Sequence, residues 1–198
     1  MSGASTRNRI LKAGAELIHK KGYSATGLNE ILEASGVPKG SFYHHYRSKE
    51  AFALEAVDFH LGFLVSWLGD SLAPEGPSGA LGPVERLRRF FEDHRQFLER
   101  RGFSDGCPIG NLAQETGALP EAFRVKLREA FALMRAPIEA CLLEARRGGG
   151  LPVGMEPAEA ADFILNAWEG ALLRMKVEGN EGPLRGFERF VFVGLLMK

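Results

Sequence analysis

Apolar residues recur along most of the chain at the three- and four-residue spacing of a single helical face. Within residues 10–18 they fall at i, i+3, i+4 and i+7, which is the pattern of an amphipathic α-helix. Thr6 is a suitable N-cap, and Gly22 suits the position just past the last turn. The pattern therefore predicts a first helix over about residues 6–21.

The same period predicts eight further helices. They are expected over residues 28–34, 38–46, 49–72, 84–100, 107–116, 120–147, 157–177 and 183–197. The proline- and glycine-rich loop of residues 73–79 and the triple glycine of residues 148–150 are the clearest breaks between them. No hairpin dipeptide lies between alternating runs. We therefore expect an all-α fold with nine helices and no sheet.

Composition changes this picture little. The 198 residues are 45% apolar and 25% charged, which is typical of a soluble globular chain. The two cysteines are too few for a disulfide framework. No apolar run approaches the roughly 20 residues of a membrane span, and residues 1–9 do not resemble a secretory signal. A cytoplasmic location is expected.

Charge divides the chain more sharply than composition does. Residues 1–49 carry eight lysines and arginines and three glutamates, whereas residues 50–198 carry an excess of five acidic groups, so the net charge is zero. A basic head on an acidic body is expected of a protein that contacts phosphates with one end. Chance clustering accounts for the charge pattern equally well.

Residues 27–46 have the sequence form of a helix-turn-helix, with a glycine-containing turn between two short helices. The outward face of the second helix carries small and polar residues: Lys39, Gly40, Ser41, Tyr43 and His44. Its inward face carries Val37, Phe42 and Tyr46. Such a helix reads base edges in the major groove, with phosphate contacts expected from Tyr43 and Lys49. The alternative is a short surface helix packed by aromatic residues.

Residues 36–51, with the sequence GVPKGSFYHHYRSKEA, resemble the DNA-binding signature of the TetR family of bacterial transcriptional regulators. Residues 10–18 and 22–26 are similar to the first helix of that family and the turn after it. The match covers about residues 6–55. Gly27 stands where the family often has Ser or Thr as the N-cap of the second helix, and glycine replaces these at slight cost.

This resemblance implies an all-α homodimeric repressor without a cofactor, a metal or catalytic residues. Residues 1–48 would form the helix-turn-helix DNA-binding domain, and residues 49–198 a ligand-binding and dimerisation domain. A small-molecule effector would change the spacing of two heads on a palindromic operator and release the protein. The resemblance implies these DNA-binding residues: Thr26, Pro38, Lys39, Gly40, Ser41, Tyr43, His44 and Lys49.

The last two predicted helices are candidates for the dimer interface. Their apolar stripes are Phe163, Ile164, Ala167, Trp168, Ala171 and Leu172, and Phe187, Phe190, Val191, Gly194 and Leu195. Two such helices from each chain would make a four-helix interface. The alternative is that these stripes are only the core of one subunit.

Aromatic and methionine side chains of the body suggest an apolar effector chamber. The candidates are Phe59, Phe63 and Trp67 on the fourth helix, Phe131 and Met134 on the seventh, and Trp168 on the eighth. Each of them reads equally as plain core.

Residues 106–115 and 168–176 resemble the TetR branch that includes the N-ethylmaleimide- and acrylate-responsive repressors. Cys107 stands at the start of a predicted helix, where partial positive charge favours the thiolate. One hypothesis is that Cys107 senses an electrophile or oxidant, or lines the effector pocket, and the alternative is a buried small hydrophobe. Asn111 and Glu115, one turn apart, are either polar groups of the pocket or surface and capping residues.

Enzyme signatures are missing from the sequence. There is no Gly-x-Ser-x-Gly, P-loop, dinucleotide fingerprint or His-Glu-x-x-His, and His44 and His45 are adjacent, so they cannot chelate one metal from a helix. The rival interpretation is a helical small-molecule carrier or a hydrolase-like enzyme with an incidental basic head. DNA binding that weakens steeply with salt distinguishes a regulator from both.

Overall fold

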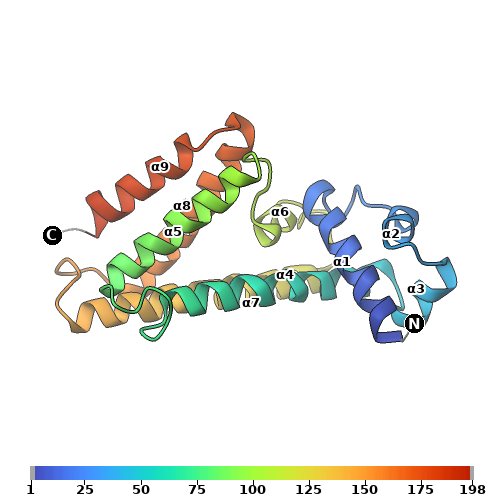
Figure 1. Ribbon diagram of the computed structural model, residues 1–198, viewed down its shortest axis with the longest axis horizontal. Coiled ribbons are helices and arrows are strands. Elements are labelled where there is room, and N and C mark those ends of the chain that lie inside the picture. The colour runs from blue at the N-terminus through green and yellow to red at the C-terminus, as the bar shows by residue number, and fades with distance from the viewer. Residues whose placement is uncertain (1–2, 197–198) are drawn as a thin grey trace. The chain divides into compact units, whose positions relative to one another are not determined.

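The computed structural model describes residues 3–196, and within them the regular structure is helical, with no strand (Figure 1). The helices are α1 (Gly3–Lys21), α2 (Leu28–Ser35), α3 (Lys39–His45), α4 (Lys49–Leu72), α5 (Pro83–Arg100), α6 (Pro108–Ala113), α7 (Glu121–Arg147), α8 (Pro157–Glu178) and α9 (Gly182–Arg189). The prediction of an all-α fold with nine helices is confirmed.

Four of the predicted boundaries were wrong. Helix α1 begins at Gly3, so Thr6 lies within it and is not its N-cap. Pro38 is the N-cap of α3, with extended ψ of 152°, and not its first helical residue. Helix α6 ends at Ala113. The backbone N–H groups beyond it donate to carbonyls three residues earlier, at N–O distances of 2.9–3.4 Å, as in a 3₁₀-type turn. The last predicted helix divides into α9 and a π-helical segment (Phe190–Leu195), whose Leu196 N–H donates to the carbonyl five residues earlier.

The described residues form two compact units. The head unit comprises the chain up to Phe63 together with Pro108–Ala130, and the body unit comprises Leu64–Cys107 and the chain from Phe131 onward. Helices α4 and α7 each contribute one part to either unit. The functional boundary expected after residue 48 stays a prediction.

In the head unit, α1, α2 and α3 pack around an aromatic core at the start of α4. Phe42 and Phe52 are fully buried, with ring centroids 5.7 Å apart. Helix α1 approaches this core at Gly14, where an added Cβ would lie 2.4 Å from the Phe52 ring. Gly36 adopts φ of +63°, which allows the tight turn between α2 and α3. This packing fixes the orientation of α3.

In the body unit, α5, α8 and α9 meet through a second aromatic core. The ring of Phe91 lies 4.8 Å from both Trp168 and Phe187. The buried Arg95 of α5 donates to Glu181 and Glu188 at 2.8 Å each, so an ion-pair network joins α5 to α9. Figure 1 shows α5, α8 and α9 running side by side.

Helix α4 is long and apolar enough to cross a membrane, judged by length and composition alone, and a third of its most apolar window is buried inside the protein. The sequence analysis expected no such stretch. In a helix of this kind the apolar residues serve equally as the core of a folded protein.

Candidate functional site

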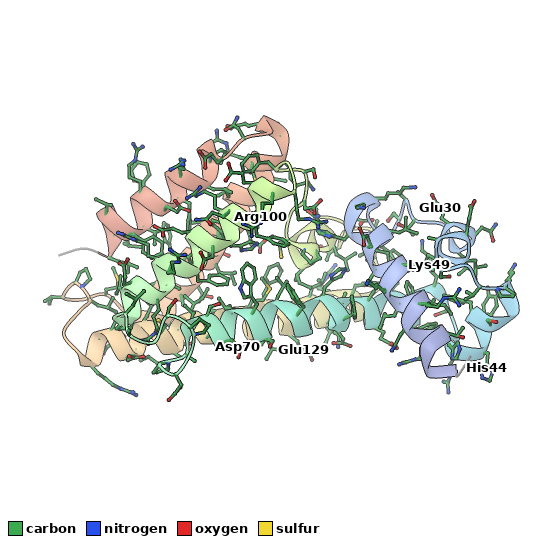
Figure 2. All side chains as sticks on the ribbon, viewed as in Figure 1. Glu30, His44, Lys49, Asp70, Arg100 and Glu129 are labelled. Carbon is green, nitrogen blue, oxygen red and sulfur yellow. The ribbon has the colours of Figure 1, made fainter. Side chains whose placement is uncertain are left out.

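The recognition helix α3 has the two faces that its sequence predicted. Phe42, Val37 and Tyr46 are buried. The outward residues are exposed, except for the half-buried Ser41: Pro38, Lys39, Gly40, Tyr43 and His44. The Tyr43 side chain is 53% exposed, and Figure 2 labels His44 on the same helix. The structure therefore brings together on one surface six of the eight residues expected to contact DNA.

The turn between α2 and α3 is held by a residue that the sequence analysis assigned only to the basic charge of the head. Arg9 on α1 donates from Nη2 to the carbonyls of Ser35, at 2.7 Å, and Gly36, at 2.9 Å. These bonds satisfy carbonyls at the C-terminal end of α2. One of the basic groups counted toward DNA thus helps to orient the recognition helix instead.

Thr26 is an expected DNA contact that lies inside the head unit. Its side chain is 1% exposed, and its Oγ1 donates to the Gly22 carbonyl at 2.7 Å. The hydroxyl thus has a structural role in the turn after α1, and a DNA contact by Thr26 stays a prediction.

Lys49 is engaged inside the head unit (Figure 2). Its Nζ donates to the Tyr23 carbonyl at 2.7 Å and lies 4.2 Å from the centroid of the Tyr23 ring. Partial burial lowers the pKa of Lys49, and Glu115 and Glu30 oppose that shift. An ammonium group has three donors, so a phosphate contact by Lys49 stays a prediction that requires this group to be shared or released.

Glu115 binds the same turn from the other side. Its carboxylate accepts hydrogen bonds from the backbone N–H groups of Tyr23 and Ser24, both at 2.8 Å. Burial acts to raise the pKa of Glu115, but these hydrogen bonds and the charge of Lys49 outweigh it and lower the pKa. We name this group of residues (Glu115, Tyr23, Ser24 and Lys49) the turn clamp. It fixes the segment after α6 to the turn after α1.

Asn111 lies in the head unit and contacts α1. Its Nδ2 donates to the His19 carbonyl of α1 at 3.3 Å. Asn111 and Glu115 were considered as pocket or as surface and capping residues, and instead both bind the end of α1 or the turn that follows. The reason is tertiary: α6 packs against α1 in the head unit, as Figure 1 shows.

The remaining effector candidates do not form one set. Phe63 belongs to the head unit and is 65% exposed. Trp67, Phe131, Met134 and Trp168 belong to the body unit, where Met134 and Trp168 are buried. Both tryptophan rings contact the ring of His94, a residue that the effector hypothesis did not include.

His94 lies close to both tryptophans. Its ring centroid is 4.9 Å from that of Trp67 and 5.1 Å from that of Trp168. Burial lowers the pKa of His94 to about 4, so its ring is neutral at pH 7. The signal in the sequence is a single histidine among the apolar residues of α5.

Cys107 is buried, and its thiol bonds to Glu169 on α8. Burial raises the pKa of Glu169 to about 7, and the bond from Cys107 acts to lower it. Cys141 differs, because its thiol donates to the Pro83 carbonyl at 3.0 Å and burial raises its pKa to about 11. Cys141 therefore has the character of a core residue, and Cys107 has an acidic partner.

The stripes predicted on the last two helices divide between two environments. Ile164, Trp168 and Leu172 are buried in the subunit, while Phe163 and Phe190 are 55% and 68% exposed. A groove of about 490 Å³ follows the exposed side and is lined by Phe163, Ala167, Gly170, Arg174, Gly186 and Phe190. The core interpretation thus holds for the buried residues, and the interface stays a prediction for the exposed ones.

No group of three or more histidine, cysteine, aspartate or glutamate side chains within residues 3–196 is arranged to hold a metal ion.

Two family models match the chain. Residues 10–56 match the one described as bacterial regulatory proteins, tetR family, and residues 83–191 match the one described as tetracyclin repressor-like, C-terminal domain. The first range contains α2, α3 and the start of α4, and the second contains α5 to α9.

Named relatives cover nearly the whole chain. Transcriptional regulator AcuR of Cereibacter sphaeroides is 37% identical over 91% of this chain and 80% of its own length. HTH-type transcriptional repressor DhaR of Mycobacterium sp. is 32% identical over 99% of this chain and 95% of its own.

Two solved structures have the same fold. A regulatory protein TetR from Rhodobacter sphaeroides superposes with a TM-score of 0.87 at 36% identity, covering 95% of this chain and 97% of that one. The reduced form of Escherichia coli NemR superposes with a TM-score of 0.85 at 27% identity, covering 98% of both chains.

Proposed function

Because the chain belongs to the TetR family of bacterial transcriptional regulators, we propose that it represses transcription from a palindromic operator and leaves it when a small molecule binds. The family and the named relatives are DNA-binding regulators and not enzymes, and regulators of this family dimerise. The operator, the interface and the effector of this chain are the proposed parts. We place the protein in the cytoplasm, where its operator is.

The observation that carries the proposal is the surface of α3. A fully buried Phe42 anchors the helix, and its polar residues face outward with a tyrosine and a lysine among them. In the major groove, Lys39 and Ser41 at the N-terminal end are placed to contact base edges, and Tyr43 a phosphate. The DNA-contacting set is then Pro38, Lys39, Gly40, Ser41, Tyr43 and His44, with Lys49 as a conditional member.

A second copy of the chain is the proposed occupant of the groove on α8 and α9. Phe163 and Phe190 are large apolar side chains left exposed, and Gly170 and Gly186 between them allow close approach of another helix. Pairing α8 and α9 with their copies would bury these rings and place two heads for two half-sites.

The proposed effector site lies in the body unit, with Trp67, Phe131, Met134 and Trp168 as its apolar part and Cys107 at its edge. A ligand that prefers one arrangement of the two units would shift the DNA-binding equilibrium. Cys107 either lines this site or reacts with an electrophile, since its acidic partner Glu169 is positioned to accept the thiol proton.

Enrichment of operator-like duplexes from a random DNA library tests the DNA-binding proposal. We expect inverted repeats whose half-site centres are one helical turn or a multiple apart. Tyr43→Ala should weaken binding, whereas Arg100→Ala, which removes an exposed charge from the body unit, should not. A monomer that enriches no inverted repeat at low salt would contradict the proposal.

Treatment with N-ethylmaleimide tests the role of Cys107. If Cys107 is a sensor, the reagent releases the protein from its operator and Cys107→Ala abolishes that release. Cys141→Ala is the matched control, because the Cys141 thiol is bonded to Pro83 and its raised pKa disfavours the thiolate. Equal release of the Cys107→Ala variant would refute the sensor role.

A further inference from the structure

Three buried polar atoms of the body unit have no hydrogen-bond partner: His94 Nδ1, Trp168 Nε1 and Glu169 Oε1. Among the described residues only one other side-chain atom, on Arg88, shares this condition. Buried polar groups in native proteins are paired almost without exception, because leaving one unpaired is unfavourable. Three such atoms in one region point to a partner that the chain itself does not supply.

Two of the three atoms belong to neighbouring rings, and the third belongs to the next residue of the chain. The rings of His94 and Trp168 are 5.1 Å apart, and the ring of Trp67 lies 4.9 Å from that of His94. Glu169 follows Trp168 on α8, and its carboxyl group is bonded to the Cys107 thiol. The unpaired atoms thus come from α5 and α8, beside aromatic rings that would cover the apolar part of a ligand. We call this group of residues (His94, Trp168 and Glu169) the unpaired cluster.

The chemistry of these atoms restricts the ligand. The indole N–H of Trp168 only donates, and an ionised Glu169 only accepts. His94 is neutral and takes either role at Nδ1 according to its tautomer. A partner for all of them therefore has both an acceptor and a donor.

The charge of the cluster restricts the ligand further. Glu169 makes no ion pair with a described lysine or arginine, and Arg95, the buried arginine one residue from His94, is bonded to Glu181 and Glu188. A site with a carboxyl group and no cation disfavours an anion. A purely apolar ligand would leave all three atoms unpaired.

We propose that His94, Trp168 and Glu169 bind the effector directly, and that the effector is a small uncharged molecule with a carbonyl oxygen next to an N–H, as in a primary carboxamide. Its oxygen accepts from Trp168 Nε1, and its N–H donates to Glu169 Oε1 or His94 Nδ1. This inference rests on the proposed function, since it names the ligand class of the same body site, and it replaces the apolar effector expected from the sequence.

Intrinsic fluorescence reports on this site directly, because the only two tryptophans of the chain, Trp67 and Trp168, both lie next to the His94 ring. The probes are propionamide, butanone and propionate, which are similar in size and differ in their donor and charge. At pH 8 the full-length protein should show a saturable change with propionamide at a concentration at least tenfold below that needed for butanone or propionate. Butanone or propionate saturating at or below the propionamide concentration would overturn the proposal.

Two variants locate the selectivity. Glu169→Leu should reduce the preference for propionamide over butanone to about twofold or less, and Glu169→Gln, which keeps a carbonyl acceptor in the same place, should retain part of it. Glu159→Gln changes an exposed glutamate of the same helix and should leave the preference intact. A folded Glu169→Leu variant with full preference for propionamide would refute the role of Glu169.

Operator binding measured in parallel separates this inference from the proposed function. Selective binding of propionamide supports the inference even where operator affinity does not change, and in that case effector-induced release is the part that fails. Release by other compounds, without any selectivity for the amide in fluorescence, leaves the repressor proposal in place and overturns the inference.

Discussion

The head unit and the body unit differ in how far their polar side chains are paired. In the head unit the Thr26 hydroxyl, the Lys49 ammonium and the Glu115 carboxylate all bind backbone groups of the turn after α1. In the body unit the buried Arg95 is paired, but the polar atoms of His94, Trp168 and Glu169 lie buried without a partner. Thr26 is buried like these groups, whereas Lys49 and Glu115 are half-buried.

The difference corresponds to what each unit has to do. A helix that reads base edges must keep its geometry, and internal hydrogen bonds fix the turn and the helices that orient it. A unit that responds to a ligand gains from polar groups that only the ligand satisfies, because the ligand then favours one conformation over another. Substitutions that change the hydrogen-bond partners of one unit or the other test this difference, and the largest effect is expected for Glu169.

The pH dependence of stability is the strongest test of the unpaired cluster. The pKa of Glu169 is raised from 4.5 to about 7, so the folded protein holds a proton that the unfolded chain loses, and stability falls as the pH rises from 4.5 to 7. The full loss is on the order of 3 kcal/mol. Relative to the wild type, Glu169→Gln should gain this amount between pH 4.5 and pH 8, as measured by urea unfolding at constant protein concentration.

His94 has the opposite sign, which gives the same experiment a control. Its pKa is lowered from 6.5 to about 4, so its contribution is complete above pH 6.5 and is lost as the pH falls toward 4. The two trends oppose each other between pH 4.5 and 6.5 in the wild type. The raised pKa of Glu188 acts in the same way in both proteins, so the test is the difference in stability between Glu169→Gln and the wild type. A difference that does not grow between pH 4.5 and 7 would contradict the assignment.

Removing the carboxylate of the turn clamp should convert paired groups of the head unit into unpaired ones. Glu115→Ala leaves the N–H groups of Tyr23 and Ser24 without their partner, and hydrogen bonds to a charged group contribute about 1.5–3 kcal/mol. We expect a loss of stability of about 2–3 kcal/mol together with weaker operator binding. Amide hydrogen exchange should increase at Tyr23 and Ser24.

Gln114→Ala is the matched control for the turn clamp, because Gln114 is exposed and adjacent to Glu115. It should change neither stability nor exchange. Unchanged protection of the Tyr23 and Ser24 amides in Glu115→Ala would show that the clamp does not hold the turn.

Thr26→Val separates a structural role from a DNA contact. The substitution keeps the shape of the buried side chain and removes the bond to the Gly22 carbonyl, so we expect a loss of about 1 kcal/mol in stability. Operator affinity of the folded protein, measured by fluorescence anisotropy well below the unfolding temperature, should stay within twofold of the wild type. A large loss of affinity with unchanged stability would restore Thr26 as a DNA contact.

Lys49→Ala should have the smallest effect. It tests whether the Lys49 ammonium contacts a DNA phosphate as well as the Tyr23 carbonyl. If Lys49 also reaches a phosphate, the variant binds all duplexes more weakly and the slope of log affinity against log salt falls by about 1. Lys39→Ala should alter the preference between operators more than the general affinity. An unchanged salt slope in Lys49→Ala would assign Lys49 to the turn clamp alone.

The sequence by itself determined the helices and the faces of the recognition helix. Helical period, N-caps and the glycine turn at Gly36 are local properties, so the nine helices and the burial of Phe42 followed from neighbouring residues. The signature of residues 36–51 carried the family. The dimer stripe stays a prediction, and period alone does not tell which side of α8 faces its own subunit.

Only the tertiary structure decided which polar groups are paired. Tyr23 and Glu115 are 92 residues apart in the chain, and His94 meets tryptophans from α4 and α8. Neither contact leaves a periodic or local signal in the sequence. The pairing of a buried polar atom depends on what other elements place beside it, so the occupied turn clamp and the unpaired cluster emerged only once the helices were packed.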